Sequence, residues 1–359
     1  MLNWNVAVFA ADDPDCDWKT FEETDTYVME NCVTENGYSA RVRQKPVDGI
    51  KIEIVEAPKK KANPIQEFKD KVKEAPKATA KVEKLEKIEE EVIVTENKVK
   101  ELKEKNIVPN LVVILVGEMK ASASYVAQKE KFAAKAGIKS EVRRFTAEIS
   151  EEEILSEIDK INNDSLIHGV IVQLPLPDHI SVAKVLNRIH PSKDVDGFTP
   201  NNVGKLFLGE DTLVSCTPKG IMQMLRISGT DLSGKNVTVI GRSNIVGKPV
   251  SILCQSENAT VTMCHSRTKD LNHKLSDADV IIVAVGVPKF ISGDQIPKGA
   301  VVIDVGIHNI DGKLCGDVDF ESAKEKASAI TPVPGGVGPM TVCALIENTI
   351  IAAERINSA

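Results

Sequence analysis

The sequence predicts an α/β protein with two domains of mainly parallel sheet, the second of them Rossmann-like, and an amino-terminal extension of unclear fold. The chain has 359 residues, 42% of them hydrophobic, which is more than one ordinary domain needs. From residue 92 onward, short apolar runs alternate with helical segments, as is typical of parallel strands covered on both faces. A glycine-bounded turn joins one such strand to a helix, as in dinucleotide-binding folds.

The composition argues against several classes of protein. The formal net charge is −7 and the pI is near 5.6, so no broad excess of Lys and Arg is available to neutralise nucleic-acid phosphates. The seven cysteines are scattered and form no CxxC pair, which indicates a reducing compartment and no metal site. The amino terminus lacks the pattern of a signal peptide, and no apolar run approaches the roughly 18 residues of a membrane span. We expect a cytoplasmic protein without nucleic-acid or membrane partners.

The amino-terminal part divides into two segments. Residues 1–57 form a small extension in which residues 38–44 and 50–55 are predicted to pair as a β-hairpin around Pro46-Val47-Asp48-Gly49. Residues 58–91 are rich in Lys, Glu, Ala and Pro and predict a charged linker. A charge run of this kind is normally a solvated tether, although a docking site is an alternative. No chemistry is assigned to this part.

The first α/β domain is expected over residues 92–215, completed by a return helix at residues 340–357. The second domain is expected over residues 216–339. In the first domain we predict strands at residues 111–116, 141–145 and 169–173, with helices at residues 95–105, 122–136 and 151–162. In the second we predict strands at residues 236–240, 259–264, 279–285 and 300–305, with a helix at residues 247–254.

The dinucleotide site is predicted where the strand at residues 236–240 runs into Gly241-Arg242-Ser243-Asn244-Ile245-Val246-Gly247. N–H groups at a helix start carry partial positive charge, and the two glycines let the chain approach a pyrophosphate closely. The motif departs from GxGxxG, so a purely structural strand-turn-helix is an alternative.

The turn after the next strand favours NADP over NAD. It reads Cys264-His265-Ser266-Arg267 and lacks the Asp or Glu that usually binds the ribose 2′-hydroxyl of NAD. Arg242, Ser266 and Arg267 are instead suited to a 2′-phosphate, which arginine binds through charge-assisted, forked hydrogen bonds. A merely solvated Arg267 is the alternative.

A catalytic group is predicted on the helix at residues 122–136. Ser122, Tyr125 and Lys129 are spaced i, i+3 and i+7, so they share one face, where Tyr125 can orient the Lys129 amine. A lysine held away from bulk water can shuttle protons. The same spacing also fits an ordinary amphipathic surface. Gln173 favours a site, because it ends an apolar strand at the edge where open α/β sheets bind ligands.

Two carboxylates in Lys193-Asp194-Val195-Asp196-Gly197-Phe198 form a further candidate. Their apolar neighbours Val195 and Phe198 make an ordinary surface turn improbable. We predict that Asp194 or Asp196 is a buried, paired carboxylate.

Six ordered segments over about residues 102–353 resemble the methylenetetrahydrofolate dehydrogenase/cyclohydrolase family. They are ASASYVAQKEK (residues 121–131), VIVQLPLPDHI (170–180), KDVDGFTPNNVGKL (193–206), GRSNIVGKP (241–249), ATVTMCHSRT (259–268) and TPVPGGVGPMT (331–341). The resemblance implies oxidation of 5,10-methylenetetrahydrofolate to 5,10-methenyltetrahydrofolate with NADP, followed by hydrolysis to 10-formyltetrahydrofolate. It also implies tetrahydrofolate derivatives as ligands and a homodimer.

The resemblance also implies roles for single residues. Lys129 is the expected catalytic residue, supported by Tyr125 and Gln173. Asp196 and Ser122 are expected to bind the substrate, beside a side-chain-poor loop containing Pro334, Gly335 and Gly336. The expected NADP site comprises Gly241, Arg242, Ser243, Ile245, Gly247, Ser266, Arg267 and Ile307.

The sequence departs from the family pattern in places. Thr199, Ser215 and His308 stand where the family commonly has His, Pro and Asn, and the usual opening Asp-Gly-Lys segment is not visible before Thr95. Two alternatives therefore stand beside the bifunctional enzyme. One is a single-activity dehydrogenase of the same fold, and the other is a binding scaffold with an inactive folate domain. The intact set of predicted site residues speaks against the scaffold.

Overall fold

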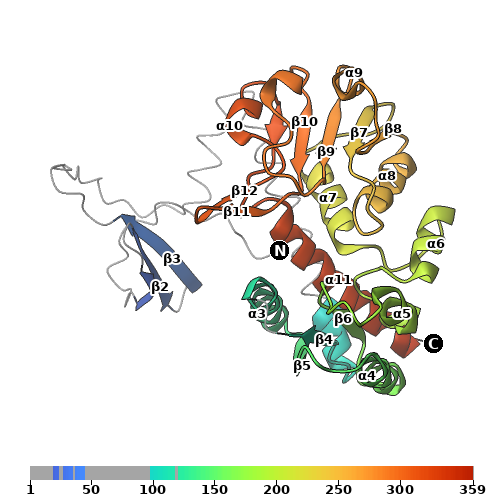
Figure 1. Cartoon of the computed structure of the whole chain (residues 1–359). Coiled ribbons are helices and arrows are strands. Elements are labelled where there is room, and N and C mark those ends of the chain that lie inside the picture. Colours follow the sequence, from blue (N-terminus) through green and yellow to red (C-terminus); the bar gives the residue numbers. More distant parts are fainter. Residues whose placement is uncertain (1–18, 24–26, 35–36, 45–97, 118–119, 359) are drawn as a thin grey trace. The chain divides into compact units, whose positions relative to one another are not determined.

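The computed structural model describes residues 19–23, 27–34, 37–44, 98–117 and 120–358 (Figure 1). The side chains of residues 19–23, 27–34, 37–44, 120–125, 127 and 128 are not among those described. The chain separates into two units, Met1–Glu83 and Lys84–Ala359. Each is described by itself below.

The first unit contains an antiparallel sheet in the order β1-β2-β3, formed by Lys19–Glu23, Tyr27–Thr34 and Gly37–Gln44. The predicted strand at residues 38–44 is confirmed as β3. Its partner in the structure is β2, from the pair Tyr27 and Gln44 to the pair Thr34 and Gly37. The other predicted hairpin arm, residues 50–55, lies outside the described residues, as does the predicted linker at residues 58–91.

The second unit begins its described part with helical residues 98–104, followed by a parallel sheet in the order β5-β4-β6. Its strands are β4 (Asn110–Val116), β5 (Lys139–Phe145) and β6 (Gly169–Val172). Helix α3 (Lys120–Lys135) follows β4, and α4 (Glu151–Asn163) follows β5. The predicted βαβαβ order is confirmed, with boundaries shifted by a few residues.

Strand β4 is apolar along its length because helices cover both of its faces. Its residues Val112, Ile114 and Val116 pack in one cluster with the isoleucines of α4. The alternate residues Leu111, Val113 and Leu115 pack in a second cluster with residues of α3 and the carboxy-terminal helix α11 (Val337–Ser358). A strand buried on both faces has no polar alternation, which explains the continuous apolar run.

Helix α4 shows how local sequence fixes an element. Ser150 is its N-cap, and a reciprocal capping box with Glu153 satisfies two backbone N–H groups at the helix start. Its buried residues Ile154, Ile158 and Ile161 recur at helical spacing on the face toward the sheet. These signals are all legible in the sequence.

The parallel sheet β5-β4-β6 is called the first sheet below, and a second parallel sheet follows it in the chain. This second sheet is Rossmann-like, with five parallel strands in the order β13-β10-β9-β7-β8. The strands are β7 (Asn236–Ile240), β8 (Thr260–Cys264), β9 (Val280–Val283), β10 (Val301–Asp304) and β13 (Ala329–Ile330). The chain passes from β7 outward to β8 and then crosses back to β9 on the other side. The strand order therefore reverses between β7 and β9, at the position where such sheets bind dinucleotides.

Several elements were absent from the sequence-based prediction. They are the strands β1, β2 and β13, the helices α5 (Val182–Arg188), α6 (Pro200–Leu208), α7 (Cys216–Ile227), α9 (Leu271–Leu275) and α10 (Phe320–Ala323), the hairpin strands β11 (His308–Ile310) and β12 (Lys313–Cys315), and two 3₁₀ turns. The predicted helix at residues 247–254 is α8 (Gly247–Ser256).

Helix α11 returns to the first sheet, as predicted. It contacts α3, β4 and β6 there and also packs along α7. A Cβ atom at Gly220 of α7 would lie 2.9 Å from the Met340 backbone, so the glycine permits a close crossing of the two helices.

Among the described residues, α11 is the one helix long and apolar enough to cross a membrane by length and composition. The sequence analysis had expected no such run. However, 61% of the most apolar stretch of this helix is buried inside the fold. Its apolar side chains therefore pack against the rest of the protein, as in a core helix.

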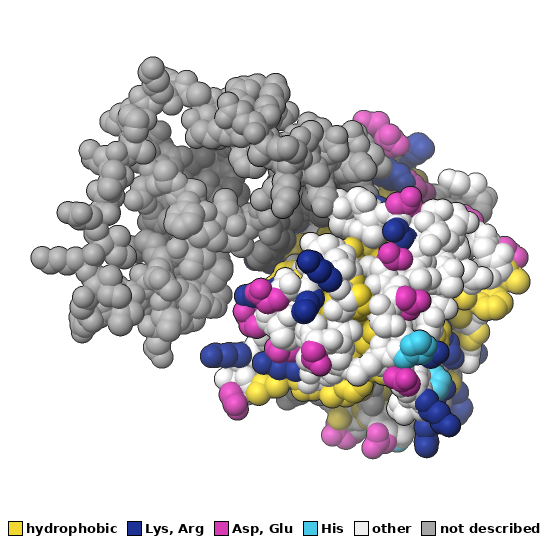
Figure 2. Space-filling model, turned by 90° about the horizontal axis from the view of Figure 1, so that it is seen from above, with side chains coloured by type: hydrophobic (Ala, Val, Ile, Leu, Met, Phe, Trp, Pro, Cys, Tyr) yellow, Lys and Arg dark blue, Asp and Glu magenta, His cyan; other side chains and the backbone are white. Residues whose placement is uncertain are grey.

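The surface charges are mixed on the face of the molecule shown in Figure 2. Lys and Arg side chains are interspersed there with Asp and Glu side chains. The described part of that face therefore lacks the continuous basic surface that phosphate backbones require.

Candidate active site

Lys129 and Gln173 meet at the carboxyl end of the first sheet. The Lys129 Nζ atom donates a hydrogen bond to Gln173 Oε1 over 3.1 Å. Lys129 projects from α3, and Gln173 directly follows β6, which its backbone N–H extends by bonding to the Ile114 carbonyl. The Gln173 Nε2 atom donates to the Leu174 carbonyl over 2.9 Å, so its oxygen is left to face the amine. The structure thus unites two of the predicted catalytic residues.

Ser122 and Tyr125 lie on the backbone of α3, as predicted, but their side chains are outside the described part of the structure. Their place on the face of Lys129 stays a prediction.

Asp196 lies within electrostatic range of Lys129. The residue is partly exposed, but its carboxyl group is crowded, and this burial raises the pKa of Asp196 above its ordinary value. The positive charge of Lys129 opposes that rise, whereas the negative charge of Asp194 adds to it. The site therefore holds an amine, an amide and a carboxyl group from three different segments of chain.

Asp194 is the buried carboxylate of the pair, with 1% of its surface exposed. It accepts hydrogen bonds from the backbone N–H groups of Phe198 and Thr199, at 3.1 and 2.8 Å, and from Asn202 Nδ2 at 2.9 Å. The predicted burial of this carboxylate is confirmed. Its hydrogen-bond partners named here are neutral donors and not a positively charged side chain. Asp194 closes the turn that presents Asp196, and its own backbone bridges to Val170 of β6.

Thr199, which departs from the family pattern, has a structural role. It is the N-cap of α6, and its hydroxyl accepts a hydrogen bond from the Asn202 N–H over 3.4 Å. Threonine is a favoured residue for such a cap.

Pro334, Gly335 and Gly336 lie immediately before α11. The Val333–Pro334 peptide is cis, and Gly335 has a φ of 103°, a conformation that favours glycine. Pro334 and Gly335 are exposed, while a Cβ atom at Gly336 would lie 2.6 Å from the Pro332 carbonyl oxygen. This loop is therefore compact, as predicted, but it is not part of the Lys129–Gln173 hydrogen-bonded contact.

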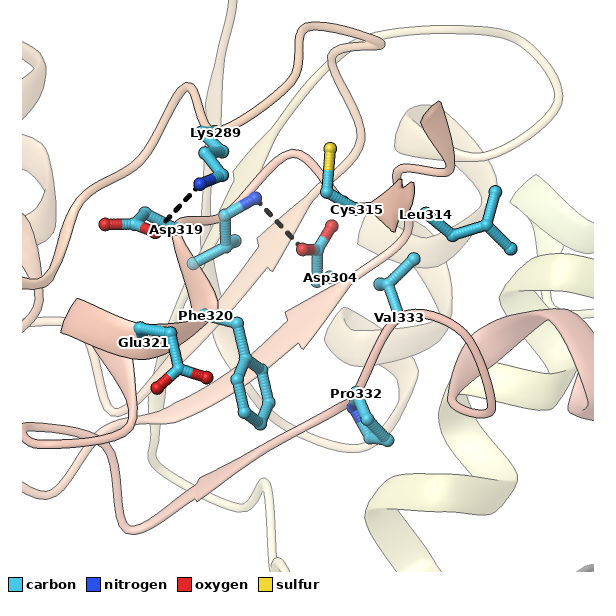
Figure 3. Close-up of a pocket in the computed structure, with 11 residues that line it drawn as sticks. Lys289, Asp304, Leu314, Cys315, Asp319, Phe320, Glu321, Pro332 and Val333 are labelled. Atoms are coloured by element: carbon cyan, nitrogen blue, oxygen red, sulfur yellow. Dashed lines mark hydrogen bonds and ion pairs between the residues drawn. The ribbon is translucent and has the colours of Figure 1, made fainter. Parts of the chain in front are cut away.

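A pocket of about 230 Å³ lies beside the start of that loop (Figure 3). It is lined by Lys289, Asp304, Leu314, Cys315, Gly316, Val318, Asp319, Phe320, Glu321, Pro332 and Val333. Its charged groups have partners within the fold: Lys289 pairs with Asp319 at 3.7 Å, and Asp304 accepts from the Val318 N–H at 2.9 Å. Burial raises the pKa of Asp304.

The predicted cofactor residues converge at the carboxyl edge of the second sheet. Ile240 of β7 is paired with Cys264 of β8, so Arg242 and Ser266 each stand two residues beyond the ends of adjacent strands. Ile307 follows β10 at the same edge. Arg242, Ser266 and Arg267 are all exposed, and the side chains available there suit an anionic ligand.

Gly241 and Gly247 are required by backbone packing. Gly241 has a φ of 123°, and a Cβ atom there would lie 2.2 Å from the Ala284 carbonyl oxygen. A Cβ atom at Gly247 would lie 2.2 Å from the Gly241 carbonyl oxygen. The glycines thus hold the turn against both the β9 edge and the start of α8. The structural alternative therefore explains both glycines, and binding of a dinucleotide by this turn stays a prediction.

The Ser243 side chain accepts hydrogen bonds from the backbone at the start of α8. Its Oγ atom accepts hydrogen bonds from the N–H groups of Val246 and Gly247, at 3.1 and 3.3 Å. Those two N–H groups, predicted to face a pyrophosphate, are therefore engaged within the turn. Binding of the cofactor by Ser243 and by Ile245, which is 41% exposed, stays a prediction.

Asp317, for which the sequence predicts no role, lies close to the carboxyl edge of the sheet where the cofactor is predicted to bind. It is fully buried, and its Oδ2 atom accepts from the N–H groups of Val285 and Gly286 at 2.7 and 2.9 Å. Its Oδ1 atom is 2.7 Å from Nε2 of His308, the residue that replaces the family's Asn. One carboxylate therefore ties together the loops that follow β9 and β10. These partners are too distant in sequence for a local motif to reveal them.

The fold and the site together define a two-lobed, dinucleotide-dependent enzyme with an amine-bearing centre on its first sheet. Comparison with known proteins gives the family. The model "Tetrahydrofolate dehydrogenase/cyclohydrolase, catalytic domain" matches residues 66–196, and "Tetrahydrofolate dehydrogenase/cyclohydrolase, NAD(P)-binding domain" matches residues 215–357. The chain belongs to the tetrahydrofolate dehydrogenase/cyclohydrolase family. The match begins at residue 66, so the expectation that the resemblance starts near residue 102 was wrong.

Characterised relatives match over most of their length. The bifunctional protein FolD of Bacillus velezensis is 55% identical over 280 residues, which cover 78% of this chain and 96% of the relative. That of Bacillus licheniformis is 58% identical over 258 residues, covering 72% and 91%. The solved structure of Campylobacter jejuni FolD, a methylenetetrahydrofolate dehydrogenase/cyclohydrolase, has a TM-score of 0.72 and 46% identity, covering 77% and 97%. The Trypanosoma brucei enzyme, complexed with NADP and an inhibitor, has a TM-score of 0.71 and 37% identity, covering 79% and 97%.

Proposed function

We infer that this chain oxidises 5,10-methylenetetrahydrofolate to 5,10-methenyltetrahydrofolate with NADP and hydrolyses the product to 10-formyltetrahydrofolate. The family assignment, and similarity along nearly the full length of bifunctional relatives, supports both activities. The contact between Lys129 and Gln173 carries the inference, because it supplies a held amine at the ligand-binding edge of the catalytic domain.

When bound, NADP would supply the acceptor for a hydride from the one-carbon bridge of the substrate. In this chain, Arg242 and Ser266 stand at matched positions beyond adjacent strands, and Arg267 is next to them. This donor set contains no carboxylate that would repel a 2′-phosphate, so it fits NADP. The turn bounded by Gly241 and Gly247 follows β7, where the strand order of the sheet reverses. We propose that the pyrophosphate binds at this turn.

Lys129 moves protons in the hydrolytic step. In the proposed step, water adds to the methenyl carbon and loses a proton, which the uncharged form of the Lys129 amine carries away. The bond between this carbon and N5 then breaks, its electron pair and the proton pass to N5, and the carbon remains on N10 as the formyl group. Gln173 holds that amine through the 3.1 Å hydrogen bond, and Tyr125 orients it from one turn earlier on α3. We propose that Gln173 and Tyr125 together keep the amine directed at the one-carbon unit.

Asp196, Ser122 and the loop of Pro334, Gly335 and Gly336 bind the folate. Burial raises the pKa of Asp196, and its carboxyl group is the proposed hydrogen-bonding partner of the pterin ring. The exposed, side-chain-poor faces of Pro334 and Gly335 suit a flat ring.

The test of this mechanism is Lys129→Met, with Lys131→Met as the matched control on the exposed side of the same helix. Removing a general acid–base group lowers a rate by about 10²–10⁴-fold, so Lys129→Met should lose hydrolysis by about that factor. Its affinity for NADP, measured by titration, should be unchanged. Full hydrolysis in Lys129→Met would overturn the assignment. Wild-type protein that forms NADPH but accumulates methenyltetrahydrofolate would instead support the single-activity alternative.

We also propose the domain organisation predicted above: an extension over residues 1–57, a linker over residues 58–91, a folate domain over residues 92–215 with its return helix at 340–357, and an NADP domain over residues 216–339. The two separate parallel sheets support the division between the last two. We further propose a cytoplasmic homodimer, as the family resemblance implies, to be tested by light scattering of the purified chain.

A further inference from the structure

Asn348 is a buried amide in the middle of α11, with 1% of its surface exposed. Its Nδ2 atom donates hydrogen bonds to the carbonyl oxygens of Val195 and Val214, both at 2.8 Å. Its Oδ1 atom accepts from Lys219 Nζ at 2.9 Å. A lysine can only donate, so this contact fixes which end of the amide faces the carbonyls. Both ends of the side chain are therefore used in joining α11, α7 and two loops.

The Val195 carbonyl immediately precedes Asp196, and a second group holds it. The Cys216 Sγ atom donates to the same oxygen over 3.1 Å. Burial and the nearby charge of Asp196 raise the pKa of Cys216 well above its ordinary value, so the thiol keeps the proton that it donates. The carbonyl before the predicted substrate carboxyl is thus held from two helices, α7 and α11.

The residue after Asp196 is equally constrained. A Cβ atom at Gly197 would lie 2.5 Å from the Ser215 backbone nitrogen, and the Ser215 hydroxyl donates to the Gly197 carbonyl over 3.3 Å. With Asp194 bound as described above, the backbone on both sides of Asp196 is fixed. Its position relative to Lys129 and Gln173 therefore depends on contacts outside the first sheet.

We propose that Asn348 is a positioning residue of the folate site, which sets the Asp196 carboxyl group against Lys129 and Gln173. The inference rests on the proposed substrate-binding role of Asp196. Asn348 acts through the Val195 carbonyl: without its amide, one of the two donors that hold this oxygen is lost, and the Val214 carbonyl is left without the donor that Asn348 supplies. The turn then relaxes, and the Asp196 carboxyl group moves away from the folate.

Steady-state kinetics of Asn348→Ala test this role, with Thr349→Val as the matched control. Thr349 is fully buried on the same helix, but its hydroxyl donates to the Leu345 carbonyl within α11 and does not reach the Asp196 turn. Loss of two buried hydrogen bonds should raise the KM for methylenetetrahydrofolate about tenfold in Asn348→Ala. The KM for NADP should stay within about twofold of wild type, and Thr349→Val should leave both constants unchanged.

A double-mutant cycle separates positioning from general destabilisation. Asp196→Asn should itself raise the KM for the folate, and Asn348→Ala should add less than about threefold in that background, because both changes disable the same contact. If Asp196→Asn leaves the folate KM unchanged, the proposed role of Asp196 is wrong. The positioning role of Asn348 is wrong if Asp196→Asn raises the folate KM but Asn348→Ala alone does not. It is also wrong if Asn348→Ala raises the folate KM by the same factor in the Asp196→Asn background as in wild type.

Lys219→Met decides the question if Asn348→Ala does not fold. This change removes the donor that orients the amide and leaves Asn348 itself in place. It should raise the folate KM about threefold, because the amide loses the donor that orients it but can still form its two hydrogen bonds to the Val195 and Val214 carbonyls. A folate KM equal to that of wild type would then overturn the proposal.

Discussion

Gly247→Ala is the sharpest test of how the turn after β7 serves the cofactor. A Cβ atom at this position would lie 2.2 Å from the Gly241 carbonyl oxygen, 2.6 Å from its carbonyl carbon and 2.9 Å from the Arg242 Cα atom. Real Cβ atoms do not approach backbone atoms below 3.0 Å, so the turn must move by most of an ångström. Overpacking of this kind costs about 1–3 kcal/mol of the free energy of unfolding.

The same displacement should weaken NADP binding, because Arg242 and Ser243 belong to the turn that moves. We expect the Kd for NADP, measured by titration, to rise at least about tenfold, since an ångström of misplacement can cost far more at a preorganised site. Gly204→Ala is the matched control. Gly204 lies within α6 with no atom within 4 Å of its Cβ position, so alanine there should stabilise the fold by about 0.5–1 kcal/mol and leave NADP binding unchanged. Wild-type affinity for NADP in a folded Gly247→Ala protein would refute the reasoning.

Two further predictions concern buried groups. Burial and the charge of Lys193 lower the pKa of His168, which is 4% exposed. As the pH falls below 6.5, the unfolded chain therefore takes up a proton that the folded chain does not, and the free energy of unfolding should fall by up to about 1.4 kcal/mol per pH unit. Chemical denaturation at several pH values between 5 and 7 should show a smaller dependence of this free energy on pH in His168→Gln. An equal pH dependence in the variant would contradict this cause. Asp317→Leu should raise the KM for NADP more than about tenfold, because two buried N–H groups lose their acceptor. The control Asp319→Leu, two residues further along the chain, should leave this KM unchanged. Equal effects of the two changes would dismiss the role of Asp317.

The elements that the sequence revealed are those with a local signal. Strand β4 is buried on both faces and reads as an unbroken apolar run, and α4 carries a capping box and a regular stripe of isoleucines. Helix α6 escaped prediction for the opposite reason. Among its residues Asn202 is buried, whereas Phe207 and Leu208 are 70% and 71% exposed, so its apolar residues do not mark the face that packs.

The candidate site divides in the same way. Lys129 and Gln173 lie at positions that the spacing and the strand end could indicate, and the structure places them in contact. Which of Asp194 and Asp196 is buried depends on donors from α6 and its preceding turn, and only the fold supplies these. The contact of Asn348 with Val195 spans 153 residues of sequence, so no local pattern can reveal it. Ser243 illustrates a further limit, because a hydroxyl in a turn can serve the ligand or accept hydrogen bonds from the start of a helix.

We infer that one chain carries out both reactions on tetrahydrofolate with NADP. A spectrophotometric assay of the purified full-length protein, supplied with 5,10-methylenetetrahydrofolate and either NADP or NAD, measures both reactions together. We predict NADPH formation, faster turnover with NADP than with NAD, and conversion of the methenyl product to 10-formyltetrahydrofolate without lasting accumulation. Absence of NADPH formation, or a methenyl product that persists unhydrolysed, would contradict the account.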